Sequence, residues 1–170
     1  MATRGYYQSQ RGALVLAGSR NHLLTLAVVF LWSITLSNWN LKMSYTIDRL
    51  ITDTDFEEVD SRTRTALAAH GFGVLTEIDV KATMKKKLDV EMTPYRILGA
   101  CNPQMAHQAI GMEPKIGAML PCNVILREVE GGVQVSAVDP IASMQAIDNE
   151  SLHAVAGQVR DMLSTVVEEI

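Results

Sequence analysis

The clearest pattern of hydrophobic and polar positions lies at the C-terminal end of the chain. Apolar residues recur every three or four positions from Leu152 to Ile170, which is the spacing of one face of an α-helix. Shorter helical patterns occupy residues 54–71, 79–88 and 102–111. Between them, alternating or β-branched apolar segments predict strands at residues 44–51, 72–78, 95–101, 119–129 and 133–139.

Two adjacent strands near the C-terminus decide the expected fold class. Gly131 and Gly132 lie between them, and glycine accepts the positive φ of a tight hairpin turn. If both glycines form the turn, the strand pairing continues to Val124 opposite Asp139. The hairpin and the short connections favour an α+β fold, with a mixed or antiparallel sheet and helices packed on one face.

Capping residues mark where the helices are expected to begin. Thr54 followed by Glu57 has the spacing of a capping box, in which each side chain binds the other's backbone amide. Asp79 can cap the second helix. Asn102 is a cap residue followed by Pro103 at the first helical position, where the missing amide hydrogen costs nothing.

The charge of the chain is unevenly placed. Residues 1–42 hold four of the 15 basic residues and none of the 19 acidic ones, so the remainder has a net charge of −8. An acidic body without a basic patch argues against nucleic acid as a partner. With 170 residues, the sequence suits one α+β domain at residues 43–170 plus an N-terminal extension at residues 1–42.

The N-terminal extension contains a short apolar run at residues 23–36, preceded by three arginines. It is shorter than the roughly 20 residues of a membrane-spanning helix, and extending it to residue 41 adds polar side chains. Three interpretations remain open. The favoured one is a misassigned start, with translation beginning at Met43 and the domain in the cytoplasm. Alternatively, residues 23–41 form a membrane anchor with residues 43–170 outside the cytoplasm, or a cleaved signal.

One stretch of the body carries a family resemblance. Its most specific pieces are Tyr95 with the run ILGACNP that follows, then Leu120-Pro121-Cys122 and Asp139-Pro140. Together they resemble the bacterial and archaeal domain of unknown function 302, over about residues 43–170. The resemblance implies a homodimer, and it implies no particular reaction.

The two cysteines are the first candidates for chemistry. If their strands run antiparallel, Cys101 and Cys122 lie at the same end of the sheet. Cys101 also precedes the Asn102 cap, and the positive end of a helix favours a thiolate, so we expect a lowered pKa unless burial raises it. The thiols could act as a redox couple, a nucleophile or ligands of a soft ion such as Cu(I); the alternative is that both are small buried apolar residues.

Other polar residues are candidates for the same pocket. Lys85 and Lys87 could reach an anionic ligand or a thiolate, or they could form a solvated helix face. His107 lies about one and a half turns after Cys101 and could act as its base, or lie at the surface. Asp139 could share a face with Cys122, or simply start a turn. The candidate pocket residues are Lys85, Lys87, Tyr95, Cys101, Asn102, His107, Cys122 and Asp139.

No familiar motif identifies an enzyme class or a cofactor. The sequence has no P-loop, GxGxxG, GxSxG or HExxH motif, and neither CxxC nor a Cys/His cluster that would predict a metal site. Two hypotheses remain. We favour a small binding or interaction domain, homodimeric, with a ligand pocket near Cys101 and Cys122. The alternative is a thiol-dependent enzyme or a soft-metal (Cu) handling protein that uses these two cysteines.

Overall fold

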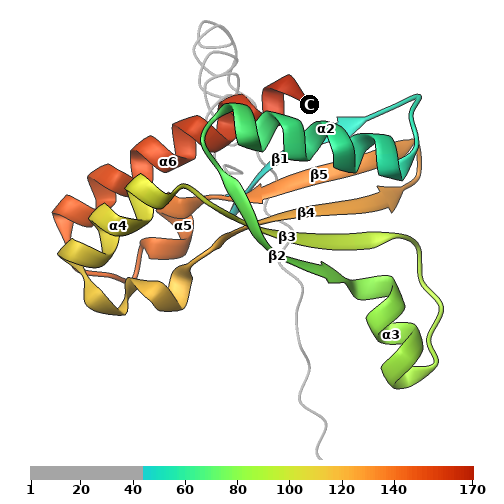
Figure 1. Cartoon of the computed structure of the whole chain (residues 1–170), viewed down its shortest axis with the longest axis horizontal. Helices are drawn as coiled ribbons and strands as arrows, with labels where there is room; N and C mark the ends of the chain where they lie inside the picture. Colours follow the sequence, from blue (N-terminus) through green and yellow to red (C-terminus); the bar gives the residue numbers. More distant parts are fainter. Residues whose placement is uncertain (1–43) are drawn as a thin grey trace, which may run out of the picture. The chain divides into compact units, whose positions relative to one another are not determined.

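A five-stranded sheet organises the computed structural model, which describes residues 44–170. Its strands lie in the order β1-β5-β4-β3-β2, and every neighbouring pair is antiparallel (Figure 1). The strands are β1 (Thr46–Ile51), β2 (Gly73–Asp79), β3 (Tyr95–Cys101), β4 (Cys122–Val129) and β5 (Gly132–Val138). The predicted α+β fold is therefore confirmed, with a fully antiparallel sheet.

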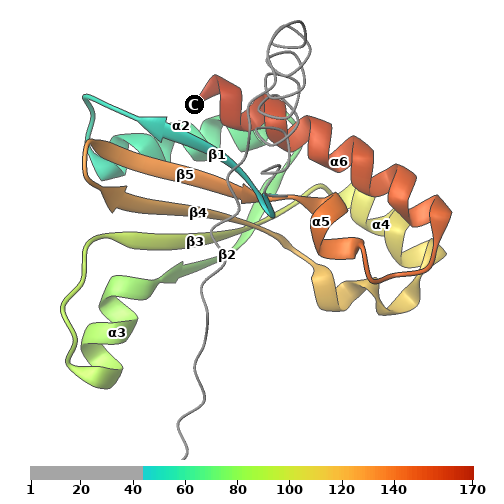
Figure 2. The same cartoon turned by 180° about the vertical axis from the view of Figure 1, so that it is seen from behind.

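The helices occupy three places around this sheet. α2 and α6 lie across one face, α4, η1 and α5 gather beyond one end of the strands, and α3 lies beyond the other end (Figures 1 and 2). The helices are α2 (Phe56–Ala69), α3 (Val80–Leu88), α4 (Pro103–Met112), the 3₁₀ helix η1 (Pro114–Met119), α5 (Pro140–Met144) and α6 (Glu150–Glu169).

The core lies between the sheet and the long helix α6. The predicted apolar stripe of α6 is buried, with Leu152, Leu163 and Val166 fully enclosed. It packs over inward-facing strand residues such as Val124 and Val135, which are also fully buried. Burying each large apolar side chain contributes about 1.5–3 kcal/mol, so α6 is a major stabilising element of the sheet.

The first turn of α2 differs from the expected capping box. The cap is Asp55, whose carboxylate accepts a hydrogen bond from the Glu58 amide at 2.8 Å. The capping-box prediction is wrong because Asp55 satisfies the free amide and Glu57 binds Arg96 instead of the cap backbone. The caps predicted at Asp79 and Asn102 are confirmed.

The β4–β5 hairpin is shifted by two residues from the predicted register. Val124 pairs with Ala137 and not with Asp139, and Glu130 and Gly131 form the turn. Gly132 belongs to β5, and a side chain there would collide with the carbonyl group of Ile51 on β1. A shift of two residues leaves every side chain on its predicted face.

The segment before β4 is helical where a strand was expected. The prediction began the strand at Met119, but residues 114–119 form η1 and β4 begins at Cys122. Pro114 at the start of η1 suits a helical turn, and the Glu113 side chain accepts a hydrogen bond from the Lys115 amide at 3.1 Å. Local capping therefore outweighs the apolar composition of this segment.

The interpretations of residues 1–42, including the start at Met43 and the location of the domain, fall outside the described residues. Between residues 44 and 170, no helix combines the length and the apolar character needed to cross a membrane.

Candidate ligand site

The structure divides the predicted pocket residues between the two ends of strand β3. Tyr95 begins this strand and Cys101 ends it. Seven residues at about 3.3 Å each span roughly 20 Å, so the two ends cannot share one small pocket. Each end has its own surroundings, and only one of them is open enough for an organic ligand.

The cysteine end encloses a small apolar cavity. Cys101, Asn102 and Cys122 line it together, because the antiparallel pairing of β3 and β4 places Ala100 opposite Cys122. The cavity volume is about 30 Å³. One water molecule needs roughly 10–15 Å³ of such space, so this cavity is too small for an organic molecule.

Both thiols are held in their neutral form. Burial, and to a smaller extent the charge of the nearby Cys101 thiolate, raises the pKa of Cys122 from 9.0 to about 11. Burial also raises the pKa of Cys101, so burial outweighs the lowering expected from the helix end. The Asn102 side-chain oxygen in addition accepts hydrogen bonds from the amides of Gln104 and Met105 at 3.1 and 3.2 Å. These amides are therefore not free to stabilise a thiolate.

Two further candidate residues near the cysteine end do not line its cavity. His107 is exposed on α4 and does not line the cavity. Asp139 caps α5 by accepting a hydrogen bond from the Ile141 amide at 2.9 Å, and it pairs with Arg160 of α6 at 3.0 Å. Asp139 therefore ties two helices together.

The candidate lysines lie on α3, a helix without a single buried residue. Lys85 forms ion pairs with Asp89 at 2.6 Å and with Glu91 at 2.7 Å. Lys87 is exposed, and neither lysine lines the cysteine cavity or the larger cavity at the Tyr95 end of β3. Of the predicted residues outside the cysteine end, Tyr95 alone lines a large cavity.

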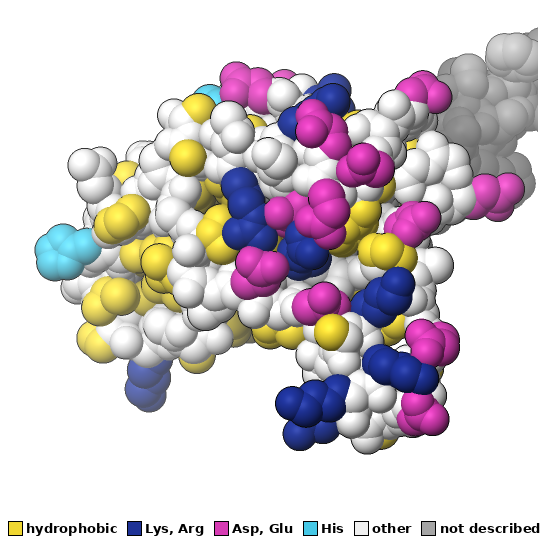
Figure 3. Space-filling model, turned by 45° about the vertical axis from the view of Figure 1, so that its right-hand side comes forward, with side chains coloured by type: hydrophobic (Ala, Val, Ile, Leu, Met, Phe, Trp, Pro, Cys, Tyr) yellow, Lys and Arg dark blue, Asp and Glu magenta, His cyan; other side chains and the backbone are white. Residues whose placement is uncertain are grey.

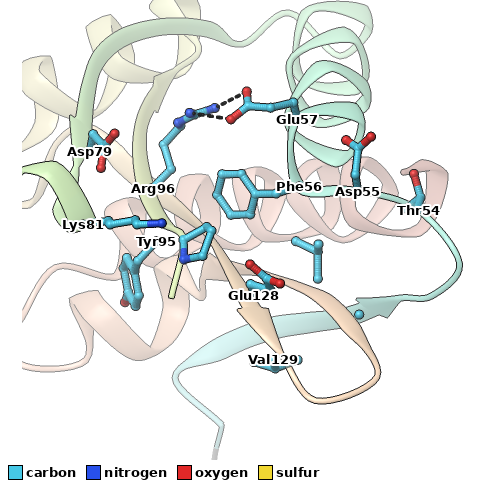
Figure 4. A pocket seen from close by; sticks show the side chains of 13 residues that line it. Thr54, Asp55, Phe56, Glu57, Asp79, Lys81, Tyr95, Arg96, Glu128 and Val129 are labelled. Atoms are coloured by element: carbon cyan, nitrogen blue, oxygen red, sulfur yellow. Dashed lines mark hydrogen bonds and ion pairs between the residues drawn. The ribbon is translucent and has the colours of Figure 1, made fainter. Parts of the chain in front are cut away.

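That cavity is an open hollow of about 590 Å³ at the α3 end of the sheet. We call it the Tyr95 hollow. It lies between the first turn of α2, the start of β3 and the β4–β5 hairpin, and Figure 4 shows its side chains. Its volume is within the range of about 300–1,000 Å³ that is typical of small-molecule sites. The lining residues are Thr54, Asp55, Phe56, Glu57, Asp79, Lys81, Pro94, Tyr95, Arg96, Glu128, Val129, Gly132 and Val133.

One wall of the Tyr95 hollow is built on Arg96. This side chain is only 15% exposed and binds Glu57 at 3.0 Å and Asp60 at 3.2 Å, with Glu77 at 3.3 Å. Its guanidinium also lies 5.2 Å from the centre of the Phe56 ring, within the range of a cation–π contact. The carboxylates raise the pKa of Arg96 above its ordinary value, led by the hydrogen bond to Glu57, so its charge is permanent.

A second arginine extends this network. Arg64 binds Asp60 at 2.6 Å and Glu77 at 2.7 Å, so two arginines share three carboxylates. Figure 3 shows basic and acidic side chains interleaved on this side of the molecule. The network joins α2 to strands β2 and β3, and it fixes the Phe56 ring at the edge of the Tyr95 hollow.

The sequence contains a signal for Arg96 that the initial prediction did not use. Within β3, Arg96 has the same parity as Leu98 and Ala100, both of which are fully buried. A charge on the core-facing side of a strand requires charged partners. Glu57 and Asp60 lie three positions apart on one helix and meet that requirement.

Comparison with known proteins places the chain in a family. The family model described as "Domain of unknown function DUF302" matches residues 49–170. The chain belongs to this family. A crystal structure described as an uncharacterized conserved DUF302 protein from Bacillus stearothermophilus has a TM-score of 0.69 at 23% identity, covering 74% of this chain and 97% of that one. This likeness establishes the shared fold. No curated protein matches.

Most charges around the hollow of this DUF302 domain already have structural partners. Asp55 caps α2, and Asp79 caps α3 by accepting a hydrogen bond from the Ala82 amide at 2.8 Å. Glu57 is paired with Arg96. These side chains are therefore not free to bind a ligand without loss of a contact within the fold.

Two charged side chains differ from these. Lys81 and Glu128 line the hollow, and within residues 44–170 neither forms an ion pair or a side-chain hydrogen bond. Lys81 extends from the α3 side and Glu128 from the β4 side, with the Phe56 ring above Glu128 and the Tyr95 ring pointing downward below Lys81 (Figure 4). A free cation and a free anion thus share one partly aromatic hollow in the DUF302 domain.

Proposed function

We propose that this DUF302 domain binds a small molecule in the Tyr95 hollow. The observation that carries the proposal is an open space of about 590 Å³ whose rim has aromatic walls and two uncommitted charges of opposite sign. Small-molecule sites typically combine apolar walls with a few polar groups that fix the orientation of the ligand. The proposal keeps the binding-domain hypothesis and moves its pocket from the cysteines to the other end of β3.

The thiol-dependent alternative has less support. Both cysteines have raised pKa values, and their cavity excludes organic substrates. Within residues 44–170, no three His, Cys, Asp or Glu side chains come together as metal ligands. A reactive thiolate at neutral pH would need the opposite electrostatic setting.

The test is a ligand-detected NMR screen of the full chain with a fragment library. Val129→Trp places an indole in the hollow, whereas Ile141→Trp adds the same group at an exposed position outside the hollow. We expect fragments that bind the wild type and the Ile141 variant to lose their signal with the Val129 variant. Fragments that bind all three proteins equally, or a screen without binders, would contradict the proposal.

We also propose that the domain is a homodimer that pairs through edge strand β2. Of the seven residues of β2, all but Val74 are exposed, and Leu75 and Ile78 present large apolar side chains at 66% and 48% exposure. An edge strand can pair antiparallel with its own copy, which produces the two-fold symmetry of most homodimers. Pairing centred on Thr76 would place Ile78 beside Val74 of the second copy, with no like charges opposed.

Light scattering coupled to size-exclusion chromatography tests this arrangement. Leu75→Glu with Ile78→Glu should convert a dimer to a monomer, because in this pairing position 75 lies opposite Glu77 of the second copy and the two carboxylates would repel each other. Ile141→Glu, at another exposed apolar position, should leave the dimer intact. A wild-type monomer, or a dimer that survives both substitutions, would show that β2 is not the interface.

A further inference from the structure

The charges left free in the Tyr95 hollow indicate what kind of molecule would fit there. A simple anion would meet Lys81 but also the carboxylates of Asp55, Asp79 and Glu128, while Arg96 is already surrounded by three acidic partners. A simple cation would meet Glu128 but be repelled by Lys81. Neither kind of ion uses both uncommitted groups.

We propose that the ligand is a zwitterion: a molecule with one ammonium group, one carboxylate and an apolar body, such as a free amino acid. The inference rests on the proposed function of the hollow. The ammonium group would bind Glu128 and the carboxylate would bind Lys81, because these two side chains line the hollow and lack other charged partners among residues 44–170.

The remaining walls suit the apolar body of such a molecule. Phe56 offers an aromatic surface, and Pro94 and Val133 add aliphatic surface. Phe56 is held in place by Arg96, which lies 5.2 Å from its ring centre. An aromatic or branched side chain would therefore contact preformed apolar surface while its charged end lies between Lys81 and Glu128.

The hollow is open to solvent, so each charge contact contributes modestly. Lys81 and Glu128 are both exposed, and one exposed ion pair changes an affinity by at most about fivefold. Specificity would come from both contacts together. A ligand that lacks one of the two charges loses one contact, and the protein side chain of that contact has no oppositely charged group in the complex. We therefore expect a preference for the zwitterion of up to about fivefold over either singly charged analogue.

The test uses three probes that share one apolar body. L-phenylalanine carries both charges, 2-phenylethylamine carries the ammonium group alone, and 3-phenylpropanoate carries the carboxylate alone. Their affinities for the full chain are measured by NMR titration at low ionic strength, where exposed charge pairs are least screened. L-phenylalanine should bind most tightly of the three.

Two variants assign the contacts. Lys81→Met should weaken L-phenylalanine by about fivefold and leave 2-phenylethylamine unchanged or tighter, whereas Glu128→Gln should weaken L-phenylalanine and leave 3-phenylpropanoate unchanged or tighter. Lys86→Met and Glu130→Gln remove the same charges from exposed positions outside the hollow and should change no affinity.

The outcomes separate this inference from the proposed function. Equal affinity for all three probes, no binding of L-phenylalanine, or equal effects of both variants on every probe would overturn the zwitterion assignment. If fragments are still displaced by Val129→Trp, the hollow remains a binding site for another class of molecule. If Val129→Trp displaces none, the proposed function and the zwitterion assignment both fail.

Discussion

Replacing Arg96 by methionine tests whether the charge network builds the wall of the Tyr95 hollow. Methionine keeps much of the apolar stem of arginine and removes the guanidinium, so the change isolates the charge. Asp60 and Glu77 would then share Arg64, and Glu57 would lose its pair with Arg96. The Phe56 ring would also lose the cation beside it.

The magnitude follows from the exposure of each partner. Asp60 is only 9% exposed, and breaking a fully buried ion pair costs about 3–5 kcal/mol. Arg64 still binds Asp60 at 2.6 Å, which lowers this cost. Glu57 and Glu77 are 74% and 45% exposed, so each pair with Arg96 contributes at most about 1 kcal/mol. We therefore expect Arg96→Met to lower the free energy of unfolding by about 2–3 kcal/mol.

Urea unfolding at pH 7, followed by circular dichroism, measures this loss. Arg62→Met is the matched control, because among residues 44–170 Arg62 pairs only with exposed Glu58 and its removal should cost less than about 0.5 kcal/mol. The double variant Arg96→Met with Asp60→Asn should lose less stability than the sum of the two single variants, because each single variant already removes the Arg96–Asp60 pair. A loss below about 1 kcal/mol for Arg96→Met, equal to that of the control, would refute the reasoning.

Three further predictions concern the core and the thiols. Leu163→Ala should lower the free energy of unfolding by about 2–5 kcal/mol in urea, because the side chain is fully enclosed; a loss below 0.5 kcal/mol would show that it is not core. The pKa of Cys122 is about 11 in the folded chain and 9.0 for an unperturbed thiol. The free energy of unfolding of the wild type should therefore fall as the pH rises from 9.0 to about 11, and Cys122→Ala should lack that part of the fall. In the folded chain, iodoacetamide should modify Cys101 before Cys122, which is more buried; mass spectrometry showing equal rates would contradict this order.

Much of the fold follows from local patterns in the sequence. The stripe of α6, the strand at residues 95–101 and the caps at Asp79 and Asn102 are visible because periodicity and capping act over a few residues. The hairpin register is different. Two successive glycines permit more than one turn, and the choice depends on the close approach of Gly132 to Ile51, which lies about 80 residues earlier in the chain.

The site was harder to predict than the fold for the same reason. The sequence indicates the cysteines as candidates because thiols are reactive groups. The burial that raises their pKa values depends on the tertiary structure and is not visible in the sequence. The Tyr95 hollow combines residues from α2, α3, β3 and the hairpin, so no local motif marks it. Arg96 could have been identified, because a charge at a core-facing strand position indicates buried partners.

The most direct test of the central claim is to locate bound ligand by methyl and aromatic NMR of the full chain. The fragments that bind the wild type are titrated while the resonances of Phe56, Tyr95 and Val129, and those of Met105 and Leu120 beside the cysteine cavity, are followed. The account predicts saturable shifts for the first group and unchanged positions for the second. Shifts confined to Met105 and Leu120 would contradict it and return the binding site to the cysteines.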